Sequence, residues 1–331
     1  MTNANISTTS VSSQPLSNEP QPTASKNRRG LYALACLLLV GVFLSLSLVV
    51  AKLANSAGAP PLSFLMTSMV GAGLVLWGIS AQQRQPVALN RRTLEYALIS
   101  GALFALPNAL GFLAIRHVGA GFISISFAFP ILITWALAVV LQLEKMRWLR
   151  LFGVLLGMVG GLVLAMAKSG GSGGAQGWAL LVMAMPVVIA CGNIYRTLRW
   201  PQNAGPVFLA ALMMFGGALT LLPFALLVEP EQIQRLFSSL QTVQFLVMEI
   251  VVFSVLYLFY FVLQKLAGPV YLSQIGTVAA LSGSLIAVLL LGEAPPANIA
   301  LAAALIAIGT LLFHRGARAP RSVGRKTAEN S

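Results

Sequence analysis

Charged residues are scarce in this sequence, and their scarcity excludes an ordinary water-soluble domain. Only 9% of the 331 residues are Asp, Glu, Lys or Arg, whereas 57% are hydrophobic. A typical soluble domain carries about 25% charged residues, enough to cover its water-facing surface. Uncharged apolar runs of about 20 residues recur along the chain, each long enough to cross a hydrocarbon core of roughly 30 Å as a helix. The composition therefore predicts an all-α polytopic membrane protein.

Residues suited to metal, disulfide and cofactor chemistry are equally few. The two cysteines, Cys36 and Cys191, lie inside apolar runs, and His117 and His314 lie at the ends of such runs, with no metal-ligand spacing among them. A nucleotide-binding loop of the form G-x-x-x-x-G-K-[ST] is missing. Catalysis within a membrane would need a nucleophile with a base, or a metal cluster. We therefore expect no metal, no cofactor, no catalytic residue and no enzymatic activity.

Ten apolar spans follow a polar N-terminal segment. The first 25 residues are rich in Ser, Thr, Asn, Gln and Pro and contain no apolar stretch, which predicts a disordered tail rather than a signal peptide. The predicted transmembrane helices cover about 31–51, 60–80, 94–115, 118–142, 149–167, 177–197, 205–228, 243–264, 268–291 and 296–313. We thus divide the chain into a disordered cytoplasmic tail (1–30), a first set of five helices (31–167), a Gly/Ser linker (168–176), a second set of five (177–313) and a basic cytoplasmic tail (314–331).

The net charge of +13 is explained by the loops and tails rather than by nucleic acid. If the ten spans alternate in direction, 17 of the 21 Lys and Arg residues fall on the side of both termini, and 4 fall on the other side. Basic residues collect on the cytoplasmic side of membrane proteins. We therefore expect a multi-pass protein of the cytoplasmic (inner) membrane, in contact with the lipid bilayer, with both termini cytoplasmic and no nucleic-acid partner.

The two sets of helices repeat one another at an offset of 149 residues. Without a gap, this offset aligns Gly119 with Gly268, Glu144 with Glu293, and Gly160 with Gly309. Pairing of two Glu is informative because the chain has only eight acidic residues. Five helices per repeat is an odd number, so the second repeat enters the membrane in the opposite sense, an arrangement found in secondary transporters. We interpret both Glu as structural residues at helix starts, where a carboxylate favours the first-turn amides.

Residues 114–165 resemble the repeat of the EamA family, in the drug/metabolite transporter superfamily. The shared pattern comprises small residues that open the fourth helix, a Pro within it, a Glu at its end and a Gly-spaced fifth helix, matched here by Gly119, Gly121, Pro130, Glu144, Gly153 and Gly160. The second repeat matches through Gly268, Glu293 and Gly309 but has Ala279 in place of the Pro. No Arg follows Pro60 and Pro61 in the second helix, where many members carry one. The resemblance implies a ten-helix carrier with a central cavity.

Glu249 is the candidate proton-coupling residue. If the eighth helix runs over 243–264, Glu249 lies about 7 Å from its centre at 1.5 Å per residue. An embedded carboxylate costs at least a few kcal/mol unless it is protonated, paired or hydrated, and so indicates a functional site. The alternative is that the helix starts later and Glu249 marks its outer edge. That start would leave 15 residues before Lys265, short of the usual minimum of about 17.

Polar residues near the midplane are the candidate substrate ligands. Asn108 follows Pro107, which leaves a backbone carbonyl without its usual donor. The side-chain amide of Asn108 can therefore form a hydrogen bond with a ligand, with that carbonyl or with a neighbouring helix. The 149-residue offset aligns Asn108 with Tyr257. Further candidates face one side of the fourth and ninth helices or end the sixth: Ser126, Thr134, Gln274, Thr277 and Asn193. Helix packing is the alternative for each. Trp135 is expected to face lipid, and Arg196 is expected to snorkel at the boundary.

Three glycines spaced by four residues mark one face of the fifth helix. Gly153, Gly157 and Gly161 permit close approach of another helix, and we interpret them as packing within the repeat or, alternatively, as the face of a homodimer. Taken together, the sequence predicts a secondary transporter, an exporter by resemblance, of a small polar organic metabolite such as an amino acid. Transport would occur by alternating access between two inverted repeats, with or without proton coupling. The alternatives are a structural or regulatory membrane protein and, less favoured, a membrane-embedded enzyme.

Overall fold

The computed structural model describes residues 23–84, 89–127, 129–142, 146–167, 174–229, 233–290, 292 and 299–318. These residues form helices joined by turns, without a strand among them, as the composition predicts. In chain order the helices are α1 (Thr23–Ser56), α2 (Pro61–Gln82), α3 (Arg91–Val118), α4 (Ala120–Ser126), α5 (Pro130–Val140), α6 (Trp148–Ala167), α7 (Gly174–Leu198), α8 (Pro206–Val228), the short 3-10 helix η1 (Gln234–Phe237), α9 (Leu240–Leu272), α10 (Ile275–Leu289) and α11 (Ile299–Arg318).

Seven segments within the described ranges are long and apolar enough to cross a membrane. They lie in α1, α2, α3, α4 together with α5, α7, α8 and α9. Helices α6, α10 and α11 occupy the other three predicted ranges, and the total of ten spans remains a prediction. α1 begins inside the predicted tail, and α7 begins inside the predicted linker. Both Glu144 and Glu293 lie outside the described residues, as does the segment 168–173.

The fourth predicted span is interrupted rather than continuous. α4 ends at Ser126 and α5 begins at Pro130. Because proline has no amide hydrogen, it suits the first position of a new helix and disfavours continuation of the preceding one. The ninth predicted span is also divided, by a turn at Ser273 and Gln274, where the sequence has no proline. Each of these two predicted spans therefore consists of shorter helical segments.

Two glycines end equivalent helices in the two repeats. α3 spans Arg91–Val118, and the regular part of α9 spans 240–267, so their bounds differ by 149 residues. The next residues, Gly119 and Gly268, have φ angles of 83° and 75°. Side chains rarely tolerate this region, whereas glycine does. The equal bounds and equal backbone turns support the repeat that the sequence offset indicates.

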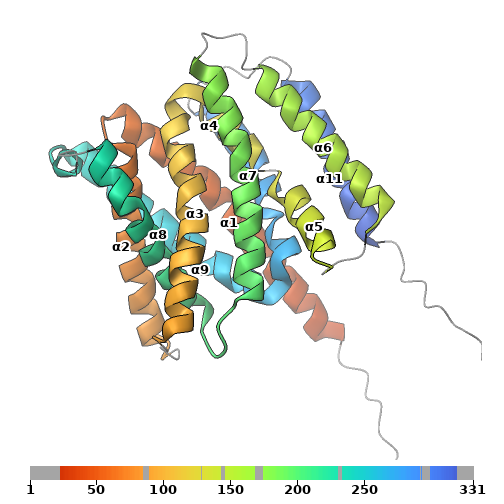
Figure 1. The fold of residues 1–331 in the computed structure, drawn as a ribbon, viewed down its shortest axis with the longest axis horizontal. Coiled ribbons are helices and arrows are strands. Elements are labelled where there is room, and N and C mark those ends of the chain that lie inside the picture. The colour runs from red at the N-terminus through yellow and green to blue at the C-terminus, as the bar shows by residue number, and fades with distance from the viewer. Residues whose placement is uncertain are drawn as a thin grey trace, which may run out of the picture.

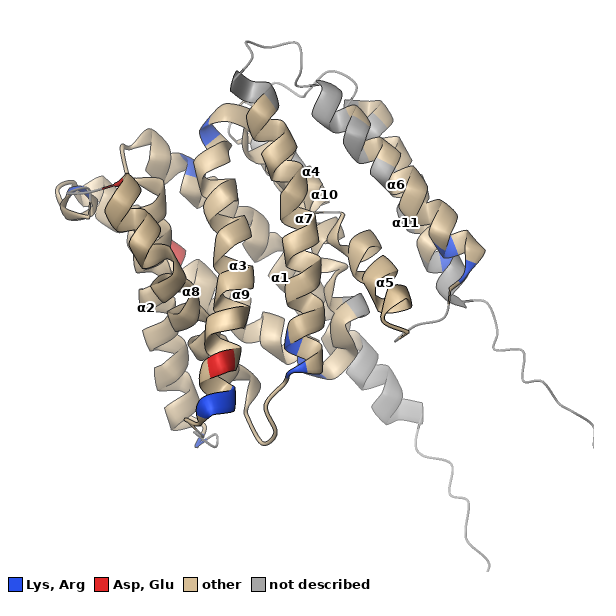
Figure 2. Ribbon diagram, in the orientation of Figure 1, with Lys and Arg blue, Asp and Glu red and all other residues tan. Residues whose placement is uncertain are grey.

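Helices of the first set pack mainly against helices of the second. The pairs that contact extensively are α1 with α9 and α10, α2 with α8, α3 with α7 and α8, α4 with α10, and α6 with α11. Figure 1 shows α2 and α8 on one side, α6 and α11 on the other, and α1, α3 and α9 between them. Described Lys and Arg residues lie largely near the helix ends (Figure 2), as a membrane protein requires. The two sets thus form one interleaved bundle.

The glycine face of α6 packs against the other repeat. A side chain at Gly153 would meet the backbone of Gly309 and Phe313 in α11, and one at Gly157 would meet Leu132 of α5. A side chain at Gly309 would also meet the backbone of Gly157, so Gly157 packs both within its own repeat and against the other one, whereas Gly153 packs against the other repeat. Because α11 and α5 cover these two glycines within the chain, they are not available as the contact face of a homodimer.

Trp135 is buried rather than lipid-facing, contrary to expectation. Its exposed fraction is 1%, and its ring meets that of Phe313 edge-on at 5.7 Å between centroids. The guanidinium of Arg150 lies 4.9 Å from the Phe313 ring centroid. The partner of Trp135 comes from the last helix of the chain, so local sequence contained no indication of it. The aromatic pair joins the two repeats beside the glycine contact.

Candidate functional site

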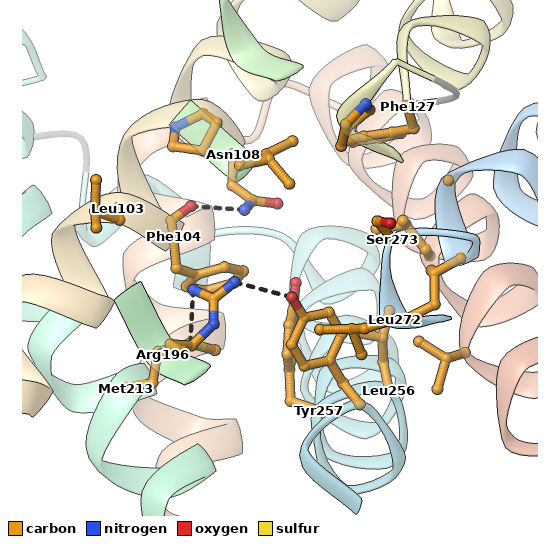
Figure 3. A pocket seen from close by; sticks show the side chains of 18 residues that line it. Leu103, Phe104, Asn108, Phe127, Arg196, Met213, Leu256, Tyr257, Leu272 and Ser273 are labelled. Atoms are coloured by element: carbon orange, nitrogen blue, oxygen red, sulfur yellow. Dashed lines mark hydrogen bonds between the residues drawn. The ribbon is translucent and has the colours of Figure 1, made fainter. Parts of the chain in front are cut away.

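A cavity lies between the two repeats. Eight of its 18 lining residues come from the first repeat (Val40, Leu44, Leu103, Phe104, Pro107, Asn108, Phe127 and Pro130), and the other ten come from the second (Ile189, Arg196, Met213, Leu256, Tyr257, Tyr260, Leu272, Ser273, Ile275 and Gly276). Most of this lining is apolar or aromatic, with a few polar groups (Figure 3). Such a composition is typical of pockets that bind small organic molecules.

Asn108 and Tyr257, the pair aligned by the offset, both line the cavity. The Asn108 Nδ2 donates to the Phe104 carbonyl at 2.7 Å, not to the carbonyl of Leu103 that Pro107 leaves without its usual donor. Figure 3 shows the Asn108 oxygen turned towards the cavity. Tyr257 packs edge-on against Phe104, with 4.7 Å between ring centroids. One acceptor and one aromatic wall are thus presented by equivalent positions of α3 and α9.

Arg196 is buried in the cavity wall, which overturns the expectation that it snorkels at the boundary. Its exposed fraction is 3%. Its Nη2 donates to Asn193 Oδ1 at 2.8 Å and to Tyr260 Oη at 2.9 Å, and the Tyr260 hydroxyl donates to Asn193 Oδ1 at 2.7 Å. The guanidinium carbon also lies 5.5 Å from the Tyr260 ring centroid. This triad fixes the cation in one place at the contact of α7 with α9.

Asn193 therefore serves the cavity indirectly. It does not line the cavity, and its side-chain oxygen accepts hydrogen bonds from two residues that do. Sequence reasoning placed Asn193 at an inner vestibule and missed Arg196 as a cavity residue. The available indication was the spacing of three, which puts both side chains on one face of α7.

Glu249 is buried inside the helix bundle, and the alternative of a later helix start is wrong. α9 begins nine residues earlier, at Leu240, and the exposed fraction of Glu249 is 0%. Ser47 of α1 donates its hydroxyl to Glu249 Oε1 at 2.5 Å, while Oε2 has no hydrogen-bond partner among the described residues. Glu249 does not line the cavity. A buried carboxylate with one free oxygen can take up and release a proton.

One face of α9 connects this carboxylate to the cavity cation. Glu249, Phe253, Tyr257, Tyr260 and Gln264 follow one another at spacings of four, four, three and four residues, so they share a face. The rings of Phe253 and Tyr257 lie 5.4 Å apart, and those of Tyr257 and Tyr260 lie 5.7 Å apart. We call these five residues the α9 stripe. Glu249 and Tyr260 are about 16 Å apart along the axis at 1.5 Å per residue, so the acid and the cation stand at opposite ends.

The other predicted ligands lie outside the cavity lining. The hydroxyl of Ser126 donates to the carbonyl of Ile123, one turn earlier in α4. Thr134 and Thr277 have buried hydroxyls that lack a hydrogen-bond partner within the described part of the chain. Gln274 caps α10, next to the lining residues Ser273 and Ile275. The polar stripes of the fourth and ninth spans thus contribute Pro130 and Ser273 to the cavity lining, which does not include the predicted side chains beside them.

Metal ligands are not gathered anywhere in the described ranges. A search of these residues finds no group of three or more His, Cys, Asp or Glu that could hold a metal ion. His117 stacks on Trp178, with 4.8 Å between ring centroids and 5° between planes. This contact explains the histidine as a packing residue at the end of α3.

Comparison with known proteins identifies the family. The model of the EamA-like transporter family matches residues 31–166 and again residues 176–315. A solved structure described as "Crystal structure of protein" has the same fold, with a TM-score of 0.64 and 18% sequence identity over 90% of this chain and 99% of that one. A search of curated proteins finds no match. Because two copies of one family model cover most of the sequence, the chain belongs to the EamA-like transporter family.

Proposed function

We propose that this protein is a secondary transporter of a small polar organic metabolite, such as an amino acid. The observation that carries the proposal is the cavity between the two repeats, since carriers built from repeats bind their substrates at that place. Ten spans in two inverted sets of five, in an inner membrane with both termini cytoplasmic, would let the halves rock about the cavity. The 17-to-4 distribution of basic residues and the equal helices α3 and α9 support this arrangement.

Glu249 is the proposed proton-coupling residue. Its carboxylate is fully buried, receives one hydrogen bond from Ser47 and belongs to the same face of α9 as the cavity residues Tyr257 and Tyr260. Protonation would remove a charge from the membrane interior, so exchange of a proton can be linked to movement of the halves. We favour export as the direction, on the family resemblance alone.

The competing function is that of a structural or regulatory membrane protein without a transported solute. Among the buried charged residues of the described chain, Glu229 binds the first turn of α2. A membrane-embedded enzyme is a weaker competitor, because the other two, Glu249 and Arg196, stand at opposite ends of the α9 stripe. The contact of one reacting molecule with both groups would require a span of about 16 Å. The shared cavity favours transport over both.

Counterflow in proteoliposomes tests transport directly. Purified protein is reconstituted, the vesicles are loaded with one unlabelled metabolite, and uptake of the same labelled metabolite is followed without any ion gradient. We expect transient accumulation above equilibrium for at least one metabolite, and equal leakage in vesicles without protein. Absence of counterflow for every solute that binds the purified protein would contradict the proposal.

A further inference from the structure

We infer that the solute is an organic carboxylate with an apolar body and no cationic group, and that Arg196 binds its carboxylate. This inference rests on the proposed transport function and names the substrate class of the same cavity. It departs from the example of an amino acid given above, because an amino acid carries an ammonium group. The relevant features are the charge of Arg196, its free donors and the chemistry of the remaining cavity wall.

A buried guanidinium needs a negative partner, and the described chain does not supply one. Arg196 is 3% exposed, and none of the described acidic residues forms an ion pair with it. Glu95 is exposed at the start of α3, and Glu229 binds the first turn of α2. Glu249 lies at the far end of the α9 stripe, bound to Ser47. An unpaired charge in a low-dielectric interior is costly, so an anionic solute would be favoured at this position.

The donors of Arg196 are arranged to receive such an anion. Its two oxygen partners, Asn193 and Tyr260, are both neutral, and both use Nη2. Nε has no hydrogen-bond partner among the described residues, and Nη1 makes a 3.8 Å contact with the sulfur of Met213. A guanidinium carries five N–H donors in a planar fork that matches the two oxygens of a carboxylate. The hydrogen bonds with Asn193 and Tyr260 therefore hold the guanidinium in place and leave Nε and Nη1 as donors for a solute.

The rest of the cavity wall selects the body of the solute. Phe104, Phe127, Tyr257 and Tyr260 contribute aromatic surface, and the 18 lining residues include no Asp or Glu. An apolar or aromatic body is favoured against these side chains, and a second oxygen function can meet Asn108. A solute ammonium would have no carboxylate to pair with in the lining, so its dehydration would go uncompensated. The wall thus disfavours amines and zwitterions relative to simple carboxylates.

The alternative is that Arg196 only joins α7 to α9. In that case Tyr260→Phe, which removes the hydroxyl between Arg196 and Asn193, would weaken the protein as much as Arg196→Gln does, and neither change would alter the preference for solute charge. If Arg196 is the anion site, the two variants differ in their preference for solute charge. Arg196→Gln removes the charge, whereas Tyr260→Phe keeps the charge and only loosens its position.

The test is a matched charge series on purified full-length protein. Two apolar bodies, phenyl and isobutyl, are each presented as a 2-oxo acid, an amino acid, an amine and an amide, beginning with phenylpyruvate, phenylalanine, phenethylamine and phenylacetamide. Affinities come from titration calorimetry and from the shift of the thermal midpoint. We expect the 2-oxo acids to bind most tightly. Arg196→Gln should weaken them by at least about tenfold, which corresponds to about 1.4 kcal/mol, while the exposed Arg199→Gln, just after the same helix, leaves them unchanged.

Every outcome of this series either supports or overturns the inference. Equal affinity for amide and acid, or wild-type affinity of Arg196→Gln for the acids, or no binding of either 2-oxo acid, would overturn the inference. The series on the unaltered chain keeps the test valid even if the Arg196 variants fail to fold. Counterflow then separates this inference from the proposed function. Counterflow of an amine with the acids excluded overturns the inference alone, whereas bound acids that show no counterflow overturn transport alone.

Discussion

Helices α3 and α9 have the same backbone and different chemistry. Both end at a glycine with positive φ, at positions 149 residues apart. At equivalent positions α3 carries Ser100, Phe104, Asn108, Gly111 and Ile115, where α9 carries Glu249, Phe253, Tyr257, Tyr260 and Gln264. Only the phenylalanine is kept. The repeat therefore preserves the helix bounds, while the second copy carries more of the ionisable and hydroxyl groups, among them Glu249, which we propose as the proton-coupling residue.

The two helices thus share their backbone path but differ in the side chains that could take part in binding or proton transfer. At three of these positions the first repeat carries a small or amide side chain (Ser100, Asn108 and Gly111), where the second carries Glu249, Tyr257 and Tyr260. Gly111 faces Met185, and Tyr260, its equivalent, bonds to Arg196 and Asn193. A duplicated fold can thus become a functional site when only one of its copies acquires charged residues. The experiments below break or sharpen this contrast, from the largest expected effect to the smallest.

Glu249→Gln should abolish proton-driven transport. The amide keeps the size and a hydrogen bond with Ser47 but cannot exchange a proton, and α3 has only Ser100 at the equivalent position to replace it. The measurement is uptake or efflux driven by a pH gradient in proteoliposomes. Protein content of the membrane should stay normal, and Glu95→Gln, at an exposed residue of α3, serves as the control. Unchanged gradient-driven flux in the Glu249→Gln variant would refute a coupling role.

Gly101→Ala should destabilise the bundle by about 1–3 kcal/mol, the usual cost of overpacking. A Cβ at Gly101 would meet the backbone of Gly216 and Gly217 in α8, which cannot move aside. Its equivalent in α9 is Ile250, which packs against Gly71 of α2 through a flexible side chain. Gly71→Ala is therefore the matched control, with a smaller loss. Thermal unfolding of the purified proteins measures both, and equal losses would show that the two helix contacts do not differ.

Glu229→Gln should cost about 1–2 kcal/mol of stability, the usual cost of losing a helix cap. At the end of α8, its carboxylate accepts the amides of Leu62 and Ser63 at 3.0 and 2.8 Å and the Ser63 hydroxyl at 2.7 Å. By contrast, the start of α8 has Gly205 and no side-chain cap, so of these two helix starts only that of α2 depends on a residue of the other repeat. Thermal unfolding again provides the measurement. A thermal midpoint as high as that of the unaltered chain would show that the Glu229 cap does not stabilise the protein.

Asn108→Ala should weaken solute binding by about two- to tenfold, the range expected for one neutral hydrogen bond. The change removes the side-chain oxygen that faces the cavity. Ser100→Ala, on the same helix and outside the cavity lining, should leave affinity unchanged because its hydroxyl bonds to the carbonyl of Tyr96. Calorimetric titration compares the two. Equal affinities for the Asn108→Ala variant and the unaltered chain would exclude Asn108 from the binding site.

Local sequence predicted the features that depend on run length and spacing. Uncharged runs indicated the helices, the paired glycines indicated the repeat, and a span too short without Glu249 indicated that this carboxylate is embedded. Asn108 and Tyr257 were found because equivalent positions of two repeats meet at their shared interface. These inferences succeed because a bilayer constrains every segment in the same way.

The sequence was uninformative wherever a residue depends on a partner from a distant helix. Arg196 stands two residues before the end of α7, where a boundary position is the ordinary interpretation. Its burial depends on Asn193 and on Tyr260 of α9. Trp135 is buried by Phe313 of α11. The break at Ser273 also lacks a local cause, since no proline marks it. Such contacts follow from how the helices pack, which single-helix patterns do not determine.

The contact of α6 with α11 has a mechanical consequence. Gly153 and Gly309 approach each other through backbone atoms, without an intervening side chain whose rotation could absorb a displacement. Close-packed contacts of this kind transmit strain rather than dissipate it. The two helices come from different repeats, so a force on one repeat is transmitted to the other through this rigid contact. Relative motion of the two repeats would have to be accommodated elsewhere, where side chains separate the helices.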